Sequence, residues 1–211
     1  MKPRVLVAAA SRHNGTREIA EAIAAGLAER GVLAEVRDVD DVADLSDYGA
    51  VVLGSAIYMN RWLAEARRFV QIHVSELCMT PVWLFSSGPL GPADHLIPPS
   101  VPADVPVLLR LTRARGHRRF GGRLEMRVLR FDERALVRTI HAPEEDRRDW
   151  AAIDRFAGEI AEDLQHNLQR CPNWLARPHR LEFCGDDGGW RAPIPGGGRA
   201  VPRSRSPWTS R

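Results

Sequence analysis

Six consecutive residues near the N-terminus have the side chains and the setting of an anion-binding loop. They are Ser11, Arg12, His13, Asn14, Gly15 and Thr16. The loop follows a short apolar run and precedes a stretch whose apolar residues have helical spacing. A phosphate would be favoured there, because the helix dipole and the unpaired amides of a helix N-terminus both attract an anion. The alternative is that Ser11 and Thr16 only cap the helix, and both interpretations stay open.

Two further segments carry small and hydroxyl-bearing residues directly after apolar runs, namely Gly54–Trp62 and Ser86–Gly91. Small residues let the backbone approach a planar ring, and Tyr58 or Trp62 could stack on that ring. The alternatives are aromatic side chains packed beneath the first segment and a plain turn at the second. The candidate ring contacts are Ser55, Ala56, Ile57, Tyr58, Ser86, Ser87, Gly88, Pro89, Leu90 and Gly91.

A phosphate loop together with two loops that admit a planar ring supplies the three contacts that flavin mononucleotide (FMN) requires. The sequence therefore predicts FMN as the cofactor. A flavin carries its own redox chemistry, so no catalytic acid or base is required from the protein. The histidines have no metal-ligand spacing, and no metal site is predicted.

Apolar strands and helices alternate along the chain and would position these loops. Strands are predicted at 4–10, 33–39, 50–54, 82–86 and 118–122. Helices are predicted from 17 to 30, 63 to 77, 123 to 140 and 150 to 164, and the proline-rich passage 89–106 is predicted to be a loop. This pattern is typical of an α/β, doubly wound five-stranded parallel sheet of order 2-1-3-4-5. The carboxyl ends of its strands would bring the three loops to one edge.

These motifs resemble the flavodoxin superfamily, and more closely its branch of menaquinone-dependent protoporphyrinogen oxidases. The likeness spans about residues 4 to 166 and rests on segments 11–20, 54–58, 85–91 and 120–124. It implies a flavodoxin-like fold with non-covalent FMN. The phosphate would lie on Ser11–Thr16, and the ring would lie between Ser55–Tyr58 and Ser86–Gly91.

The resemblance implies an FMN-dependent oxidoreductase that passes electrons from a reduced substrate, with protoporphyrinogen IX as the candidate, to a quinone. The alternative is a flavodoxin-type electron carrier, or an FMN-binding regulatory module without its own substrate. Electron-carrier flavodoxins are strongly acidic. Here residues 171–211 carry seven basic and three acidic side chains, a balance of +4 within a total of +3, so the remainder is near −1. This neutrality argues against a simple carrier.

Arginines recur between residues 123 and 138 at spacings of four, three, four and four. On a helix they would share one face. The resemblance implies a substrate-side role for Arg123, Arg127, Arg130 and Arg134, with porphyrin propionates or an anionic membrane surface as partners. A solvated helix face is the alternative. Nucleic acid is not an expected partner, because no DNA-reading motif is present.

Composition divides the chain into a predicted FMN-binding domain at 1–168 and a Pro/Gly/Arg-rich, disordered tail at 169–211. The three cysteines form no pairing pattern, and the sequence has neither a recognisable signal peptide nor a long apolar run. These features predict a cytoplasmic protein with peripheral contact at the inner face of the membrane. They do not predict an oligomeric state.

Overall fold

The computed structural model describes residues 4–88, 101–124, 127, 134 and 145–170 of the 211-residue chain. The strands are β1 (Arg4–Ala10), β2 (Ala34–Asp38), β3 (Tyr48–Tyr58), β4 (Arg61–Trp62), β5 (Val82–Ser87), β6 (Gly116–Phe120), β7 (Arg123–Leu124) and β8 (Glu145–Asp146). The helices are α1 (Gly15–Glu29), the 3-10 helix η1 (Val39–Asp41), α2 (Ala64–Ile72), α3 (Val74–Leu77), α4 (Val105–Thr112) and α6 (Trp150–Arg170).

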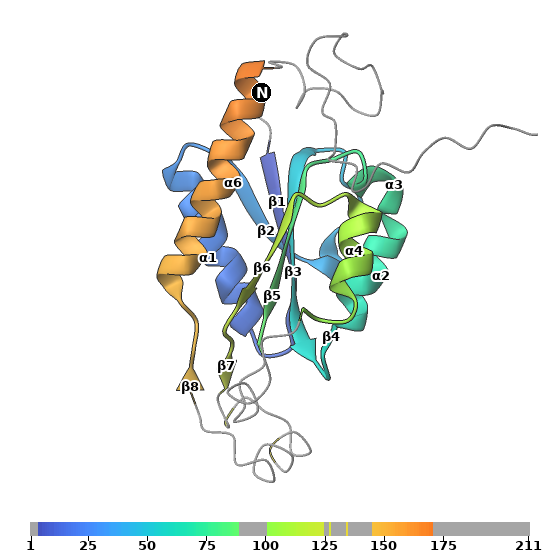
Figure 1. The fold of residues 1–211 in the computed structure, drawn as a ribbon, viewed down its shortest axis with the longest axis vertical. Helices are drawn as coiled ribbons and strands as arrows, with labels where there is room; N and C mark the ends of the chain where they lie inside the picture. The colour runs from blue at the N-terminus through green and yellow to red at the C-terminus, as the bar shows by residue number, and fades with distance from the viewer. Residues whose placement is uncertain (1–3, 89–100, 125–126, 128–133, 135–144, 171–211) are drawn as a thin grey trace, which may run out of the picture. The chain divides into compact units, whose positions relative to one another are not determined.

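Five parallel strands form the main sheet in the order β2-β1-β3-β5-β6, and β4 pairs with β3 beside this path. The order confirms the predicted doubly wound α/β fold. Helices α1 and α6 cover one face, while α2, α3 and α4 cover the other (Figure 1). Because both faces are covered, the central strands are apolar on both sides, as a parallel sheet requires.

Alternate residues of each central strand point into two separate cores. In β1, Val7 and Ala9 join the core beneath α1 and α6, whereas Leu6 and Ala8 join the core beneath α2 and α4. This alternation follows from the two-residue period of a strand. The two cores thus cover the two faces of the sheet, and the segments at its carboxyl edge lie beyond them.

The segment after residue 54 differs from the prediction. A loop was expected at Gly54–Trp62, but β3 continues to Tyr58 and turns back as a hairpin with β4. The extension forms because β5 pairs with Ser55 and Ala56 on one side, and Arg61 pairs with Tyr58 across the hairpin. Met59 and Asn60 make the turn, with φ angles of 48° and 59°.

Two helix predictions and one loop prediction also need correction. The helix expected over 63–77 is interrupted at His73 and forms α2 and α3. The expected loop over 89–106 instead ends in α4, which begins at Val105. Pro106 is tolerated in the first turn of this helix, because the N–H that proline lacks would have no partner there. Residues 123–124 form strand β7 rather than the start of a helix, because they pair with β8.

Helix α1 begins at Gly15 instead of Arg17, so Thr16 lies within its first turn. Helix α6 continues to Arg170, and the predicted division at 168/169 stays a prediction, since residues 171–211 lie outside the described part. No helix in the described part of the chain is both long enough and apolar enough to cross a membrane.

Candidate functional site

The described parts of the three predicted segments lie at the carboxyl edge of the sheet. Parallel pairing aligns Ala10 at the end of β1 with Ser55 on β3, and Ser55 in turn with Ser86 on β5. The hairpin with β4 and the short β7–β8 pair lie at this same end, at the bottom of the view in Figure 1. Strands β1 and β3 flank the switch point of the sheet, where doubly wound proteins bind their ligands.

The N-terminus of α1 presents its first amides without a side-chain cap. Asn14 occupies the cap position in the left-handed conformation, at φ 61°, and its side chain makes no capping hydrogen bond. The Glu18 amide donates to the Asn14 carbonyl at 2.9 Å, so the helical ladder begins there. The cap position thus belongs to Asn14, and neither Ser11 nor Thr16, the two residues of the capping alternative, occupies it. The Gly15 amide donates to the His13 carbonyl at 2.8 Å. The arrangement still fits a phosphate, because the positive end of the helix dipole faces the loop at 11–14 and the cap residue places no side chain on the amides that follow.

Two arginines neutralise the acidic side chain closest to that helix terminus in sequence. Glu18 accepts ion pairs from Arg123 at 2.8 Å and from Arg148 at 2.5 Å. The Arg148 side chain is only 3% exposed and also binds Asp146. The hydrogen bond from Arg148 holds the pKa of Asp146 below its usual value. An anion at the start of α1 is therefore not opposed by an unpaired Glu18 carboxylate.

The predicted arginine face is only partly described. Arg123 lies on β7 and pairs with Glu18, so its predicted place on a helix is wrong. Arg134 donates to the main-chain carbonyl of Arg127 at 3.1 Å. Arg130 lies outside the described residues. A substrate-side role for these arginines stays a prediction.

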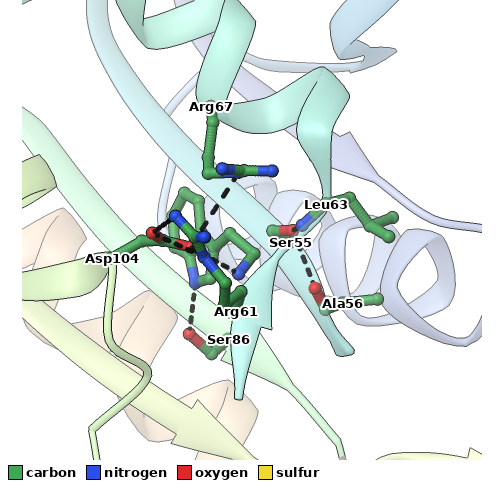
Figure 2. Close-up of polar contacts among 8 residues, drawn as sticks. Ser55, Ala56, Arg61, Leu63, Arg67, Ser86 and Asp104 are labelled. Carbon is green, nitrogen blue, oxygen red and sulfur yellow. Dashed lines mark hydrogen bonds and ion pairs between the residues drawn. The ribbon is translucent and has the colours of Figure 1, made fainter. Parts of the chain in front are cut away.

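The β3–β4 hairpin is fixed by Asp104, which lies at the N-terminus of α4 (Figure 2). Its carboxylate accepts hydrogen bonds from the Arg61 guanidinium, at 2.8 Å for the shortest, and from the main-chain amide of Trp62 at 3.1 Å. Arg67 lies 3.9 Å from the same carboxylate. The hydrogen bonds from Arg61 hold the pKa of Asp104 below its usual range. The sequence does not reveal this anchor, because the proline-rich passage 89–106 predicts a loop.

We expect Asp104→Asn to lower the free energy of unfolding by about 1–2 kcal/mol, because the Arg61 guanidinium loses its charged acceptor while the Trp62 amide can keep one. Urea unfolding measures this change. Asp47→Asn removes the same charge from an exposed residue and should alter stability by less than about 0.5 kcal/mol. Equal effects of the two variants would contradict the anchoring role.

Two serines at the predicted ring contacts are buried and already hydrogen bonded within the protein. The Ser55 hydroxyl donates to the Ala56 carbonyl at 2.9 Å and accepts from the Leu63 amide at 3.0 Å (Figure 2). The Ser86 hydroxyl accepts from the indole Nε1 of Trp62 at 2.7 Å. Trp62 is 2% exposed and packs in the core beneath α2 and α4, which favours the packing alternative over stacking on a ligand.

Tyr58 and Arg12 join the first loop to the hairpin. The Arg12 guanidinium carbon lies 4.7 Å from the centroid of the Tyr58 ring, a cation–π distance. Tyr58 is half-buried at the end of β3. Of the two candidate stacking residues, Tyr58 is thus the one that the structure leaves accessible at the sheet edge.

The third predicted segment is described only in its first residues. Ser87 ends β5, and Gly88 follows it with a φ of 90°, a backbone conformation that favours glycine. The Gly88 amide donates to the Phe120 carbonyl at 3.2 Å, which ties this segment to the end of β6. Pro89, Leu90 and Gly91 lie outside the described residues.

His117 extends the buried contact between Trp62 and Ser86 to strand β6. Its Nε2 lies 2.7 Å from the Ser86 hydroxyl oxygen. Burial, with a contribution from the nearby Arg119, lowers the pKa of His117 to about 4. The imidazole is therefore neutral at physiological pH. The structure places His117 partly buried in this chain of hydrogen bonds.

The depressed pKa of His117 predicts a pH-dependent stability. An unperturbed histidine has a pKa of about 6.5, so His117 becomes protonated in the unfolded chain below that pH. In the folded protein the same imidazole is protonated only near pH 4. The free energy of unfolding should fall as the pH is lowered through this range. His117→Gln does not titrate and should flatten the curve, as measured by urea unfolding at successive pH values. Parallel curves for the two proteins would refute the assignment.

Comparisons with known proteins agree with this architecture. A sequence model described as a flavodoxin domain matches residues 6–150. Protoporphyrinogen IX dehydrogenase (quinone) of Escherichia coli strain K12 is 26% identical over 171 residues, which cover 75% of this chain and 94% of that protein.

Two solved structures share the fold. A flavodoxin from the domain Archaea superposes with a TM-score of 0.55 at 19% identity, over 77% of this chain and 99% of the other. The rubredoxin oxygen:oxidoreductase of Desulfovibrio gigas gives a TM-score of 0.54 at 15% identity, over 79% of this chain and 38% of the other.

Proposed function

Because the chain belongs to the flavodoxin domain family, whose cofactor is FMN, we propose that it is an FMN-dependent oxidoreductase that passes electrons from protoporphyrinogen IX to a quinone. The observation that carries the FMN site is the N-terminus of α1, which has no side-chain cap, at the same sheet edge as the ends of β3 and β5. FMN, when bound, accepts electrons from one partner and delivers them to another.

We assign the phosphate to Ser11–Thr16, where the first amides of α1 and its dipole favour an anion. The ring is assigned to the edge between Ser55–Tyr58 and Ser86–Gly91. Since the hydroxyls of Ser55 and Ser86 are bonded internally, their side chains act as positioning groups that fix the backbone of this edge.

The choice of reaction rests on the E. coli relative, which is described as a quinone-dependent protoporphyrinogen IX dehydrogenase and is matched over nearly its whole length. The near-neutral charge of the domain supports an enzyme over an electron carrier, because carriers of this family use an acidic surface to dock with basic partners. We further propose a cytoplasmic location, with peripheral contact at the membrane where quinones reside.

An anaerobic assay tests the proposal. FMN-loaded protein is mixed with protoporphyrinogen IX and menadione, and the appearance of porphyrin fluorescence is followed. We expect a rate that depends on both the protein and the quinone and exceeds the rate without protein. Protein that holds FMN, yet leaves the rate at its protein-free value, would contradict the enzyme and favour the electron-carrier alternative.

A further inference from the structure

Met59 lies at the tip of the β3–β4 hairpin. Among the described residues it is the most exposed large apolar residue, at 97%. It also has a φ of 48°, and the following Asn60 has a φ of 59°. Positive φ at both central positions is typical of a tight hairpin turn that prefers asparagine and glycine. Asn60 suits this geometry, whereas methionine is strained there. Neither packing nor backbone preference therefore accounts for a methionine at this turn.

Hydrogen bonds and an ion pair support the turn on its flanks, although its tip is exposed. Arg61 is paired with Asp104, and the main-chain amide of Ala103 donates to the Asn60 carbonyl at 3.0 Å. At the start of the hairpin, the Ser55 hydroxyl accepts from the Leu63 amide. A preorganised support of this kind lowers the entropic cost of contact with a ligand.

Two arginines lie beside the turn and both are engaged, Arg61 by Asp104 and Arg12 over the Tyr58 ring. Val101, two residues before Ala103, is 52% exposed. The charge of Arg61, the cation next to the turn in sequence, is balanced by Asp104. Tyr58, which precedes Met59, ends β3 at the sheet edge assigned to the cofactor.

We propose that the Met59 turn is the contact surface for the quinone ring. This inference rests on the proposed function and deepens it. A quinone is planar and uncharged, and a flexible, polarisable thioether adapts to such a ring. The porphyrin substrate carries carboxylates and would instead be recognised by cations. At this surface the quinone takes up an electron pair from the FMN-loaded, reduced protein and two protons from solvent, and it leaves as the quinol.

The test uses variants of one fully exposed residue, so that folding is preserved. Met59→Gln keeps the length of the side chain but makes it polar, Met59→Leu keeps it apolar, and Met59→Gly relieves the strained backbone. Met79→Gln is the matched control, since Met79 is 46% exposed and precedes β5 at the opposite edge of the sheet. Each protein is loaded with FMN, reduced anaerobically and mixed in a stopped-flow instrument with either menadione or ferricyanide.

We expect Met59→Gln and Met59→Gly to slow reoxidation by menadione about tenfold, the size of one lost apolar contact. Met59→Leu and Met79→Gln should stay within about twofold of the unaltered protein, because both keep an apolar side chain at the turn. Reoxidation by ferricyanide, a hydrophilic anion, and the affinity for FMN should be unchanged in all four variants. Met59→Gly should also raise the melting temperature, which excludes misfolding as the cause of its slower reaction.

Equal menadione rates in the unaltered protein and Met59→Gln would overturn the role of the turn and leave the proposed function standing. Equal slowing with menadione and ferricyanide would also overturn it, since a general defect in electron transfer would then be responsible. If the unaltered protein binds FMN but does not reduce menadione at all, the proposed function fails, and the inference fails with it.

Discussion

Replacing Gly54 with alanine should lower the free energy of unfolding by about 3 kcal/mol or more. A Cβ at this position would lie 2.0 Å from the Cζ atom of Phe85, which pairs with Gly54 across β3 and β5. Phe85 is fully buried, so its ring has no free space into which it can move. Urea unfolding of both proteins measures the loss.

Gly116→Ala is the matched control for this substitution. Gly116 is also a strand glycine, and a Cβ there meets no atom within 4 Å. We expect the free energy of unfolding of Gly116→Ala to change by less than about 1 kcal/mol. It should rise if the lower conformational entropy of the unfolded chain is the larger effect. A smaller side chain at position 85 should also relieve the clash. The double variant Gly54→Ala, Phe85→Leu should therefore lose less free energy of unfolding than the sum of the losses in the two single variants. Similar stabilities for Gly54→Ala and Gly116→Ala would show that the contact with Phe85 does not require glycine.

Asn14→Asp should weaken FMN binding about 100-fold while leaving the fold intact. Aspartate is nearly isosteric with asparagine, tolerates the left-handed conformation, and is a good residue at a helix N-terminus. It adds a negative charge beside the site assigned to the phosphate. Like charges about 5 Å apart repel by about 3 kcal/mol at an effective dielectric constant of about 20, which corresponds to about two orders of magnitude in affinity. Titration of FMN into each protein, followed by flavin fluorescence, measures the change.

Two controls separate the local charge from a general effect. Riboflavin lacks the phosphate, so Asn14→Asp should leave its affinity almost unaltered. Gln71→Glu makes the same change of charge at an exposed position of α2, outside the three segments, and should affect neither ligand. A loss of the same size for FMN and riboflavin, or no loss for FMN, would exclude the N-terminus of α1 as the phosphate site.

The sheet could be predicted because its signals are local and strong. The apolar run of β1, the helical spacing of Ile19 and Ile23, and Gly31 just beyond α1 each indicate their element without tertiary information. Their alternation limits the topology to a doubly wound sheet, and the observed order follows. The position of the first loop at the switch point followed from the same reasoning.

The errors arose where distant residues determine the local conformation. β3 extends to Tyr58 because β5 pairs alongside it and Arg61 is held by Asp104, more than forty residues away in sequence. The sequence pattern around Tyr58 does not indicate that Arg61 pairs with Asp104. A proline at the start of α4 is also compatible with a loop, so Pro106 gave no signal that could separate the two.

The polar contacts of the site were the least predictable part. Ser55 and Ser86 have the residue types expected for ligand contacts, yet their hydroxyls are bonded to Leu63 and Trp62. Likewise, Arg123 fits a helical arginine spacing, but pairing with Glu18 and β8 places it on a strand. Residue type indicates what a side chain can bind, and only the tertiary structure decides which partner it finds.

Titrations with FMN and with riboflavin show directly whether this sheet edge binds the flavin through its phosphate. The desalted protein is checked by its visible absorption for retained flavin, freed of it if present, and titrated with each ligand. We predict saturable binding of one FMN per chain and binding of riboflavin at least about 100-fold weaker, because only FMN carries the phosphate that the N-terminus of α1 favours. Failure to bind FMN, or equal affinity for both ligands, would contradict the account of this sheet edge as an FMN site.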